Sequence, residues 1–248
     1  MSIILTYPTP EELAHAAAER FLTLADESTR RRGRFAVALS GGSTPQGMYR
    51  KLATIEFAER VPWEHVHLFW SDERHVPRDH PESNYRMAVE ALLRYAPIPP
   101  ENIHPVDTTR PPEQAALEYE RAIRAFFSPE LPRFDLILLG MGHDGHTASL
   151  FPHTQALHSG ERLVVANFVP ALESWRVTFT PHLINLGRDV TFLVTGERKA
   201  RRLRQVLFGP FQPEELPAQL IRPPRGRLCW MVDEAAALHI KAANASGE

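Results

Sequence analysis

The sequence predicts an α/β fold with a doubly wound, mostly parallel sheet flanked by helices. Short apolar runs alternate with segments of helical period, which is the pattern of βα units that build a parallel sheet. No internal repeat, low-complexity tract or polar linker divides the chain. Its 248 residues suit one core, because single cores stop growing at roughly 250–300 residues. We therefore expect one domain over residues 1–248.

The N-terminal half supplies the first helix and two buried strands. After a strand at 3–6, Thr9 provides an N-cap and Pro10 the first helical position, so a helix is expected through about Asp26. The arginines of segment 30–34 end this helix; we interpret them as a solvated terminus, with a phosphate-binding patch as the alternative. The elements that follow are a strand at 35–39, a helical pattern at 47–52, a strand at 65–70 and a helix at 84–95.

The C-terminal half contains the strand expected at the centre of the sheet, at 134–139, which reads as fully buried. A proline-rich connection with a short strand at 103–106 and a helix at 112–127 precede it. The aromatic residues of that helix share one face, so we assign them to core packing. The later elements are strands at 163–166, 176–180, 189–195 and 228–232, a helix at 197–207 and a short helix at 233–238.

Composition excludes several classes of protein. The 28 basic and 30 acidic residues give a net charge of −2, which offers no field that would gather nucleic acid or an anionic membrane. The lone Cys229 excludes an intramolecular disulfide and indicates a reducing compartment. The N-terminus lacks a basic leader, and no apolar run approaches the ~20 residues of a spanning helix. We expect a cytoplasmic protein that binds any anionic ligand locally.

A glycine loop joins the strand at 35–39 to the helix that follows it. Gly41 and Gly42 allow close approach to the backbone, and the hydroxyls of Ser43 and Thr44 add donors. The helix dipole at this point favours an anion. The loop is therefore a candidate phosphate cradle, although it is neither a Walker A loop nor a dinucleotide fingerprint. The alternative is a tight turn in which Thr44 caps the helix.

A phosphate dianion also needs a fixed cation beside its amide donors. Lys199 opens a helix directly after a buried strand, so it can reach the same sheet edge as the glycine loop. Arg176, at the start of its strand, is a comparable candidate. The alternative for this stretch is an exposed basic helix face, which suits the later arginines at 201, 202 and 204.

The segment from Gly140 to Pro152 carries the sharpest signal. It follows the central strand and holds His143, Asp144 and His146 where packing alone does not explain them. Imidazole titrates near neutrality, so His146 is a candidate general base or acid. The alternatives are a metal site that includes His153, which no known ligand spacing supports, and a purely structural turn.

A second polar group follows the strand at 65–70. Asp72 and Arg74 end a strand rich in aromatic residues, so Arg74 is a natural partner for a buried carboxylate. An ion pair that braces the loop is the alternative to a functional role. No G-x-S-x-G elbow occurs and the cysteine is not on a loop, so covalent catalysis by Ser or Cys has little support.

Taken together, these segments resemble the 6-phosphogluconolactonases, the lactonase branch of the sugar-phosphate isomerase and deaminase superfamily. The resemblance covers nearly the entire chain and is most specific in the string Gly-His-Asp-Gly-His-Thr-Ala-Ser-Leu-Phe-Pro that ends at Pro152. Hexosamine-phosphate deaminases look similar up to His146 but carry an acidic residue after it, where this chain has Ala148 to Phe151. The other matching segments are 40–45, 71–77, 83–84, 176–178, 195–200 and 230–235.

The resemblance implies hydrolysis of 6-phosphoglucono-δ-lactone, the second step of the oxidative pentose phosphate pathway, without a metal or organic cofactor. It implies that His146 is the acid/base and that Asp144 orients it. Ser43 and Thr44 would meet the phosphate beside Gly41 and Gly42, and Lys199 and Arg176 would supply cations. Asp72 and Arg74 would line the lactone end of the pocket. A small-molecule substrate and a monomer or small homo-oligomer are expected.

Two rival functions stay open. In a deaminase or aldose–ketose isomerase, Asp72 would move a proton between C1 and C2 of a sugar phosphate. In a catalytically silent sensor, the same cradle would bind a sugar phosphate without turnover. Ammonia or ketose formation would indicate the first rival, and saturable binding without reaction would indicate the second.

Overall fold

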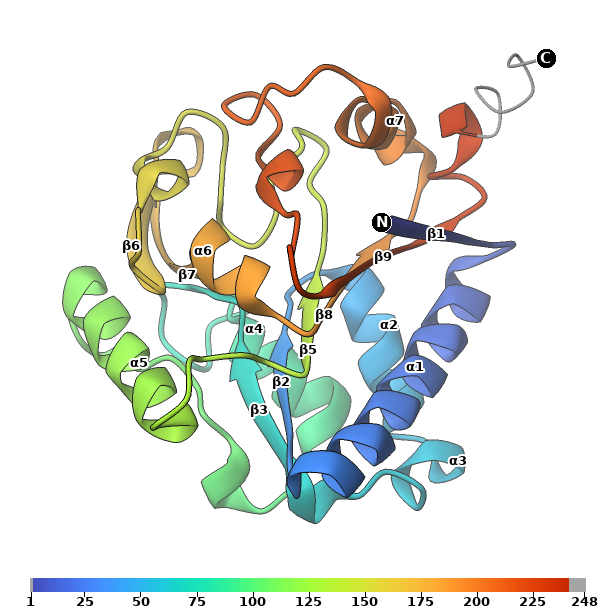
Figure 1. The fold of residues 1–248 in the computed structure, drawn as a ribbon, viewed down its shortest axis with the longest axis vertical. Helices are drawn as coiled ribbons and strands as arrows, with labels where there is room; N and C mark the ends of the chain where they lie inside the picture. The colour runs from blue at the N-terminus through green and yellow to red at the C-terminus, as the bar shows by residue number, and fades with distance from the viewer. Residues whose placement is uncertain (1, 241–248) are drawn as a thin grey trace.

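The computed structural model describes residues 2–240 and is built on a six-stranded sheet in which all strands run parallel. The predicted parallel α/β architecture is therefore confirmed (Figure 1). The strand order is β1 (Ser2–Tyr7), β9 (Arg227–Asp233), β8 (Asp189–Val194), β5 (Leu136–Leu139), β2 (Phe35–Leu39) and β3 (Val66–Trp70). The central strands β2, β5 and β8 are buried at every position, as their apolar sequences require.

Helices cover both faces of this sheet, as the sequence predicted. One face packs against α1 (Pro10–Arg32), α2 (Ser43–Leu52), α3 (Ile55–Ala58) and α4 (Asn84–Ala88). The other face packs against α5 (Pro112–Phe127), α6 (Pro181–Leu186) and α7 (Ala200–Phe208). The two hydrophobic clusters that result are rich in aromatic rings, and the α5 aromatic residues Tyr119 and Phe127 lie in the core as expected.

A second sheet was not predicted. It has three antiparallel strands in the order β4 (Asp72–Arg74), β7 (Ser174–Phe179) and β6 (Val164–Val169). It lies beside α5, at the left of Figure 1. The strand β4 starts two residues after β3 ends, so the chain passes directly from one sheet to the other through Ser71. This crossing places Asp72 and Arg74 on a strand rather than on a loop.

The first helix is longer than predicted and ends at Arg32 rather than near Asp26. Gly33 stops it in the left-handed conformation at φ 71°, and its N–H donates to the carbonyl of Thr29. Arg30, Arg31 and Arg32 belong to the last turn, where their positive charges interact favourably with the negative end of the helix dipole. Arg32 forms an ion pair with buried Asp135, so a structural role replaces the phosphate-patch alternative.

Other elements also differ from the expectations. The helix α6 was missed because it is only six residues long. The strand expected at 103–106 is a single bridge between Ile103 and Leu68. The helix expected at 84–95 is α4 followed by a π-helical turn at Val89–Leu93. Segment 234–237 forms turns before a helical segment at 238–240, instead of one helix over 233–238.

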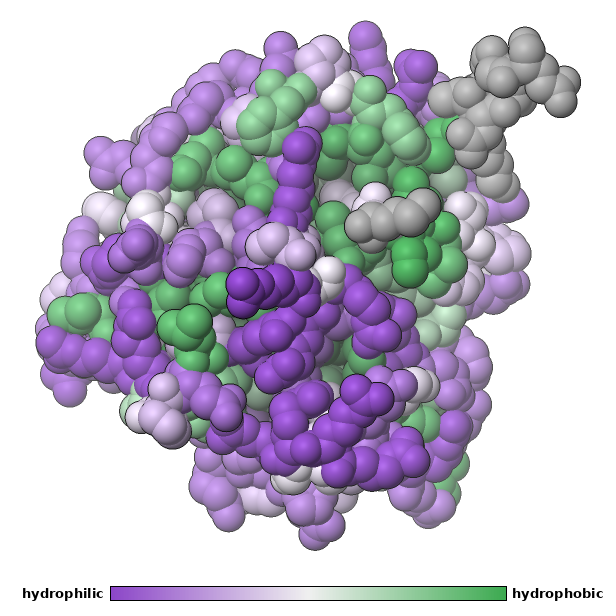
Figure 2. All heavy atoms as spheres, in the orientation of Figure 1, coloured by the Kyte–Doolittle hydropathy of each residue, from purple (hydrophilic) through white to green (hydrophobic). Residues whose placement is uncertain are grey.

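The parallel arrangement brings the carboxyl ends of β2, β3, β5 and β8 to one edge of the sheet. The glycine loop, the Asp72 segment, the His146 turn and the Lys199 turn each follow one of these strands. Figure 2 shows hydrophobic residues on the surface near strand β1. Ile3 and Leu5 of this strand are exposed. Among residues 2–240, no helix is long and apolar enough to cross a membrane.

Candidate active site

A cleft of about 690 Å³ opens at the carboxyl edge of the main sheet. This volume is in the ordinary range for a small-molecule site, about 300–1,000 Å³. Residues from all four strand ends line it, so segments far apart in the sequence share one cavity. The sequence-predicted residues that line it are Gly41, Gly42, Ser43, Thr44, Asp72, Arg74, His146 and Lys199.

The start of α2 forms one wall of the cleft. Gly42 has φ 106°, a conformation that favours glycine, and no side chain caps the helix. The first N–H groups of α2 therefore remain available to a ligand, together with the positive end of the helix dipole. The alternative role for Thr44 as a helix cap is wrong, because its hydroxyl lies 2.7 Å from the hydroxyl of Thr195.

Lys199 faces this wall from the turn between β8 and α7. The 3₁₀ turn Glu197–Lys199 begins at Gly196, whose N–H donates to the Asp233 carboxylate. The Lys199 ammonium forms no ion pair within residues 2–240. Burial lowers its pKa, and the nearby charge of Asp233 opposes that shift. A half-buried cation that forms no ion pair is suited to an anionic ligand.

The turn after β5 presents His146 together with Asp144. The Nδ1 of His146 donates to Asp144 Oδ1 at 2.6 Å, and the backbone N–H of His146 donates to the same oxygen at 3.1 Å. Burial opposes ionisation of Asp144, but the hydrogen bond and charge of His146 lower its pKa to about 2. Phe151 stacks on the imidazole at 4.0 Å between ring centroids. The ring is thus fixed, with Nε2 left free of the Asp144 contact.

Close packing in this turn depends on Gly142. A Cβ at this position would overlap both the His146 ring and the Asp144 carboxylate. The N–H of Gly142 donates to the carbonyl of His146 at 2.9 Å, which closes the turn. Gly142 therefore leaves the space in which the His146 ring lies.

Asp72 lines the cleft and is only 6% exposed. Its Oδ2 accepts a 2.6 Å hydrogen bond from the Ser149 hydroxyl. Arg74 lines the cleft but donates to the carbonyl of Glu82 at 2.7 Å, and no ion pair joins it to Asp72. The simple bracing pair considered from the sequence is therefore wrong. The two residues remain separate polar groups on the cleft wall.

Arg176 does not line the cleft. It lies in β7 of the second sheet, directly opposite Arg74 in the antiparallel register, and is 7% exposed. Burial and the charge of Arg74 lower its pKa, and its Nη1 has no hydrogen-bond partner. The structure does not bring Arg176 to the cradle beside Lys199, because β7 belongs to the other sheet. Arg176 is nearer to the Asp72 end of the site.

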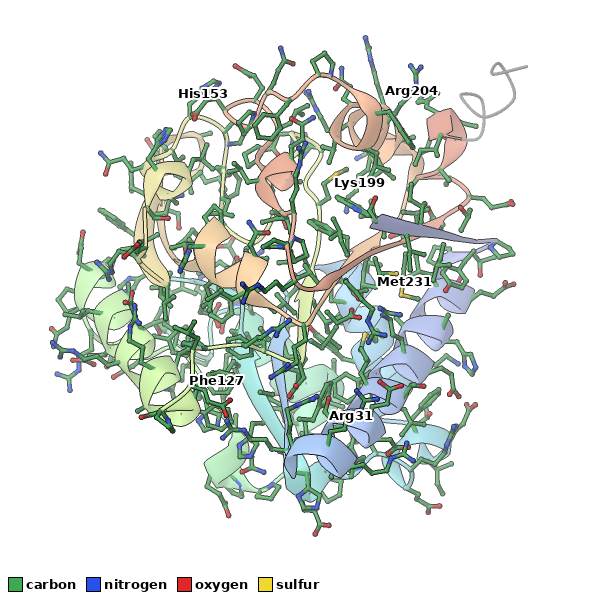
Figure 3. The ribbon with its side chains drawn as sticks, viewed as in Figure 1. Arg31, Phe127, His153, Lys199, Arg204 and Met231 are labelled. Atoms are coloured by element: carbon green, nitrogen blue, oxygen red, sulfur yellow. The ribbon has the colours of Figure 1, made fainter. Side chains whose placement is uncertain are left out.

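The remaining candidate residues differ in whether they line the cleft. His143 lines the cleft, as does Arg198, which the sequence reading missed although it stands beside Lys199 in a basic turn. His153 lies elsewhere, on an exposed loop where it contacts Glu215 at 3.0 Å (Figure 3). The alternative metal site that combined His153 with the 143–146 turn is not assembled. Apolar lining comes from Met141, Ala148 and Leu193.

Comparison with known proteins identifies the group to which this architecture belongs. Residues 8–230 match the family described as glucosamine-6-phosphate isomerases/6-phosphogluconolactonase. The chain belongs to this family. A 6-phosphogluconolactonase of Synechocystis sp. is 46% identical over 214 residues, covering 85% of this chain and 86% of that protein. A 6-phosphogluconolactonase of Rattus norvegicus is 39% identical over 239 residues, covering 95% and 92%.

Solved structures of the glucosamine isomerase/6-phosphogluconolactonase family agree in fold. A 6-phosphogluconolactonase from Trypanosoma cruzi superposes with a TM-score of 0.87 at 31% identity, covering 97% of each chain. A monomeric glucosamine-6-phosphate deaminase superposes with a TM-score of 0.78 at 20% identity, covering 95% of this chain and 99% of that one. The latter likeness concerns the fold alone.

Proposed function

We propose that the chain hydrolyses 6-phosphoglucono-δ-lactone to 6-phosphogluconate. One observation carries this proposal: His146, which is held by Asp144, lines the same cleft as the uncapped start of α2 and Lys199. The cleft thus combines an acid/base group with an anion seat, which is what a phosphorylated lactone requires. The relatives named 6-phosphogluconolactonase, at 39–46% identity, support the same substrate.

His146 is the proposed acid/base. Asp144 accepts the Nδ1 proton, so Nε2 is the nitrogen that can take a proton from water as the water attacks C1. The C1–O bond to water forms while the carbonyl oxygen becomes an oxyanion. When the tetrahedral intermediate collapses, the bond between C1 and the ring oxygen breaks, and the proton passes from His146 to that ring oxygen. One imidazole therefore serves both steps.

The phosphate seat positions the reacting carbon. The amide groups of Ser43 and Thr44 and the ammonium of Lys199 bind the C6 phosphate in this proposal. Binding energy from this remote group then holds C1 against His146, which favours the chemical step. Asp72 and Arg74 line the lactone end, where the Arg74 guanidinium is the candidate donor to the oxyanion.

The deaminase or isomerase alternative is less well supported. In that reaction Asp72 would move a proton between C1 and C2, and an acidic residue after the histidine would orient it. In this chain the residue that orients the imidazole is Asp144, which precedes His146 in the sequence. Ser149, which follows His146, donates a hydrogen bond from its hydroxyl to Asp72. The silent-sensor alternative does not require the fixed His146–Asp144 pair, whose geometry fits catalysis.

A lactone assay tests the proposal directly. Freshly prepared 6-phosphoglucono-δ-lactone is given to the purified chain, and acid release is followed after correction for spontaneous opening. We expect enzyme-dependent opening of the phosphorylated lactone and much slower opening of glucono-δ-lactone, because the latter lacks the anchoring phosphate. Ammonia from glucosamine 6-phosphate would instead indicate the deaminase, and binding without turnover would indicate the sensor.

A further inference from the structure

Glu73 is a buried carboxylate between two residues of the cleft wall. It is 3% exposed and does not line the cleft, whereas its neighbours Asp72 and Arg74 do. Side chains alternate along a strand, so the Glu73 side chain leaves β4 on the opposite side from its two neighbours. It therefore contacts the protein behind the wall rather than a ligand.

Behind the wall, the Glu73 carboxylate binds the start of α4. Its Oε1 accepts hydrogen bonds from the backbone N–H groups of Arg74 at 2.8 Å and Asn84 at 2.7 Å. Its Oε2 accepts from the N–H of Tyr85 at 2.7 Å and from the Ser83 hydroxyl at 3.3 Å. Two oxygens thus satisfy four donors, three of which are main-chain groups. The carboxylate fixes β4 and the first turn of α4 to each other.

Asn84 extends this network back to the cleft. It is 2% exposed, and its Nδ2 donates to the main-chain carbonyl of Asp72 at 2.9 Å. Its side chain also lies against the glycine loop, so closely that a Cβ at Gly41 would overlap it. A continuous set of contacts therefore runs from Glu73 through Asn84 to Asp72 and Gly41.

Retaining a charge at this depth is unfavourable in itself. Burial raises the pKa of Glu73 to about 7, against three N–H groups that favour the ionised form. An amide or an apolar side chain would avoid that desolvation, but neither can accept all four hydrogen bonds. A carboxylate suits this position because it can accept all four hydrogen bonds, although its burial is unfavourable.

We propose that Glu73 is a positioning residue that sets the lactone end of the cleft by holding Asp72, Arg74 and Asn84 in place. The proposal rests on the proposed lactonase function. Glu73 acts through these three residues and touches no substrate. The phosphate seat touches this network only where Asn84 lies against Gly41, and it has further contacts of its own in the Thr44–Thr195 hydroxyl pair and the Lys199 turn. Loss of the Glu73 carboxylate should therefore affect the chemical step more than phosphate binding.

Glu73→Gln is the test, because it preserves shape while turning one acceptor oxygen into a donor that faces N–H groups. Glu120→Gln is the matched control. Glu120 is also a buried glutamate, 6% exposed, and accepts hydrogen bonds from the N–H groups of Leu163 and Val164 and from two arginines. It joins α5 to β6 and does not line the cleft.

We expect Glu73→Gln to lower kcat by about 10- to 100-fold, since small misplacements of this kind cost that much in rate. The KM for the lactone and the Kd for 6-phosphogluconate should change by less than about threefold, because the phosphate seat is intact. Glu120→Gln should lower the melting temperature by a similar amount but leave kcat unchanged. Asn84→Ala, which keeps the Glu73 contacts, should reproduce the fall in kcat and serves if Glu73→Gln does not fold.

An activity-independent readout separates this proposal from the proposed function. Amide hydrogen exchange at Arg74, Asn84 and Tyr85 should accelerate in Glu73→Gln and stay unchanged in Glu120→Gln. Faster exchange there in a chain that hydrolyses no lactone would overturn the function but keep the positioning role. Unchanged kcat in Glu73→Gln, or an equal loss in Glu120→Gln, would overturn the positioning role while the lactonase activity stands.

Discussion

His146 derives its chemical capacity from its neighbours more than from its residue type. The chain has 12 histidines, yet only this one combines a 2.6 Å contact to an ionised aspartate with a place in the cleft, within residues 2–240. The stacked Phe151 ring and the absent side chain at Gly142 restrict the imidazole to one orientation. The proposed acid/base is thus defined by geometry.

Replacing His146 with alanine removes the proposed acid/base. We expect kcat to fall by about 10²- to 10⁴-fold, the usual contribution of general acid/base catalysis, with little change in KM. Steady-state kinetics on the lactone measure both constants. His143→Ala is the control, because His143 lines the same cleft but is not paired with Asp144. Near-wild-type kinetics for His146→Ala would transfer the role to Asp72.

Replacing Lys199 with alanine removes the cation from the phosphate seat. We expect KM to rise by about tenfold or more while kcat changes much less, because a charge-assisted hydrogen bond is worth about 1.5–3 kcal/mol. Initial-rate measurements over a range of lactone concentrations give the two constants. Arg201→Ala, which removes an exposed cation two residues along the same segment, should leave both unchanged. A selective loss of kcat in Lys199→Ala contradicts the proposed anchor.

At the scale of elements, the turn after β5 is the most sensitive part of the site. Gly142→Ala would push a methyl group into the His146 ring, so we expect activity to fall nearly as far as in His146→Ala. Gly33→Ala is the control: it has φ 71° but open space around it, and it caps α1 far from the cleft. That variant should lose about 1 kcal/mol of stability and keep its activity. Full activity in Gly142→Ala would show that the turn tolerates displacement.

Strand β3 carries an imidazole that couples stability to pH. Burial, then the charges of His104 and Arg34, lower the pKa of His67 from 6.5 to about 4. The unfolded chain therefore binds a proton at His67 at a higher pH than the folded chain does. The stability associated with neutral His67 is complete above pH 6.5 and is lost as the pH falls through about 4.

His67→Phe tests this coupling, because phenylalanine fills the space among aromatic rings without titrating. We expect a smaller decrease in melting temperature between pH 6.5 and 4 than in the wild type. Thermal unfolding across that range measures the slope. His182→Phe, at an exposed position in α6, should retain the wild-type slope, because His182 is not among the groups that lower the pKa of His67. Equal slopes in all three proteins would refute the assignment to His67.

Elements whose formation depends on their own residues could be predicted, whereas elements that depend on distant residues could not. The strand at 35–39 and the helix at 112–127 were predicted within a residue, because apolar period and terminal prolines lie within the segments themselves. The strand β4 could not be predicted from three polar residues, since its pairing with β7 depends on residues about 100 positions later. The position of Arg176 outside the cleft lining has the same cause, because its strand joins a sheet that the local pattern does not reveal.

For the whole molecule, the cleft unites four strand ends, so a ligand that fills it should stabilise the complete fold. We expect 6-phosphogluconate to raise the melting temperature, because binding to the folded state alone adds about 2.7 kcal/mol at a ligand concentration 100 times Kd. Calorimetry checks the shift. Gluconate without phosphate should have little effect, and Lys199→Ala should reduce the response. An equal shift with gluconate contradicts anchoring by phosphate.

The overall architecture was predicted more completely than the site. The alternation of apolar and helical segments was enough to predict the parallel sheet. The positions of the strand ends in the sequence were enough to predict that the glycine loop, Asp72, His146 and Lys199 lie together. Contacts such as Ser149 to Asp72, or Glu73 to α4, join residues on different elements and have no signal in a single sequence. The single domain over 1–248 and the monomer or small homo-oligomer stay predictions.

Within residues 2–240, strand β1 has one neighbour in the sheet, and that neighbour is β9, the last strand of this range. During synthesis, β1 leaves the ribosome before β9 and finds this hydrogen-bonding partner only after residues 227–233 have followed. A premature stop codon before β9 would therefore detach the N-terminal strand as well as delete the C-terminal one, leaving β8 as a newly uncovered edge.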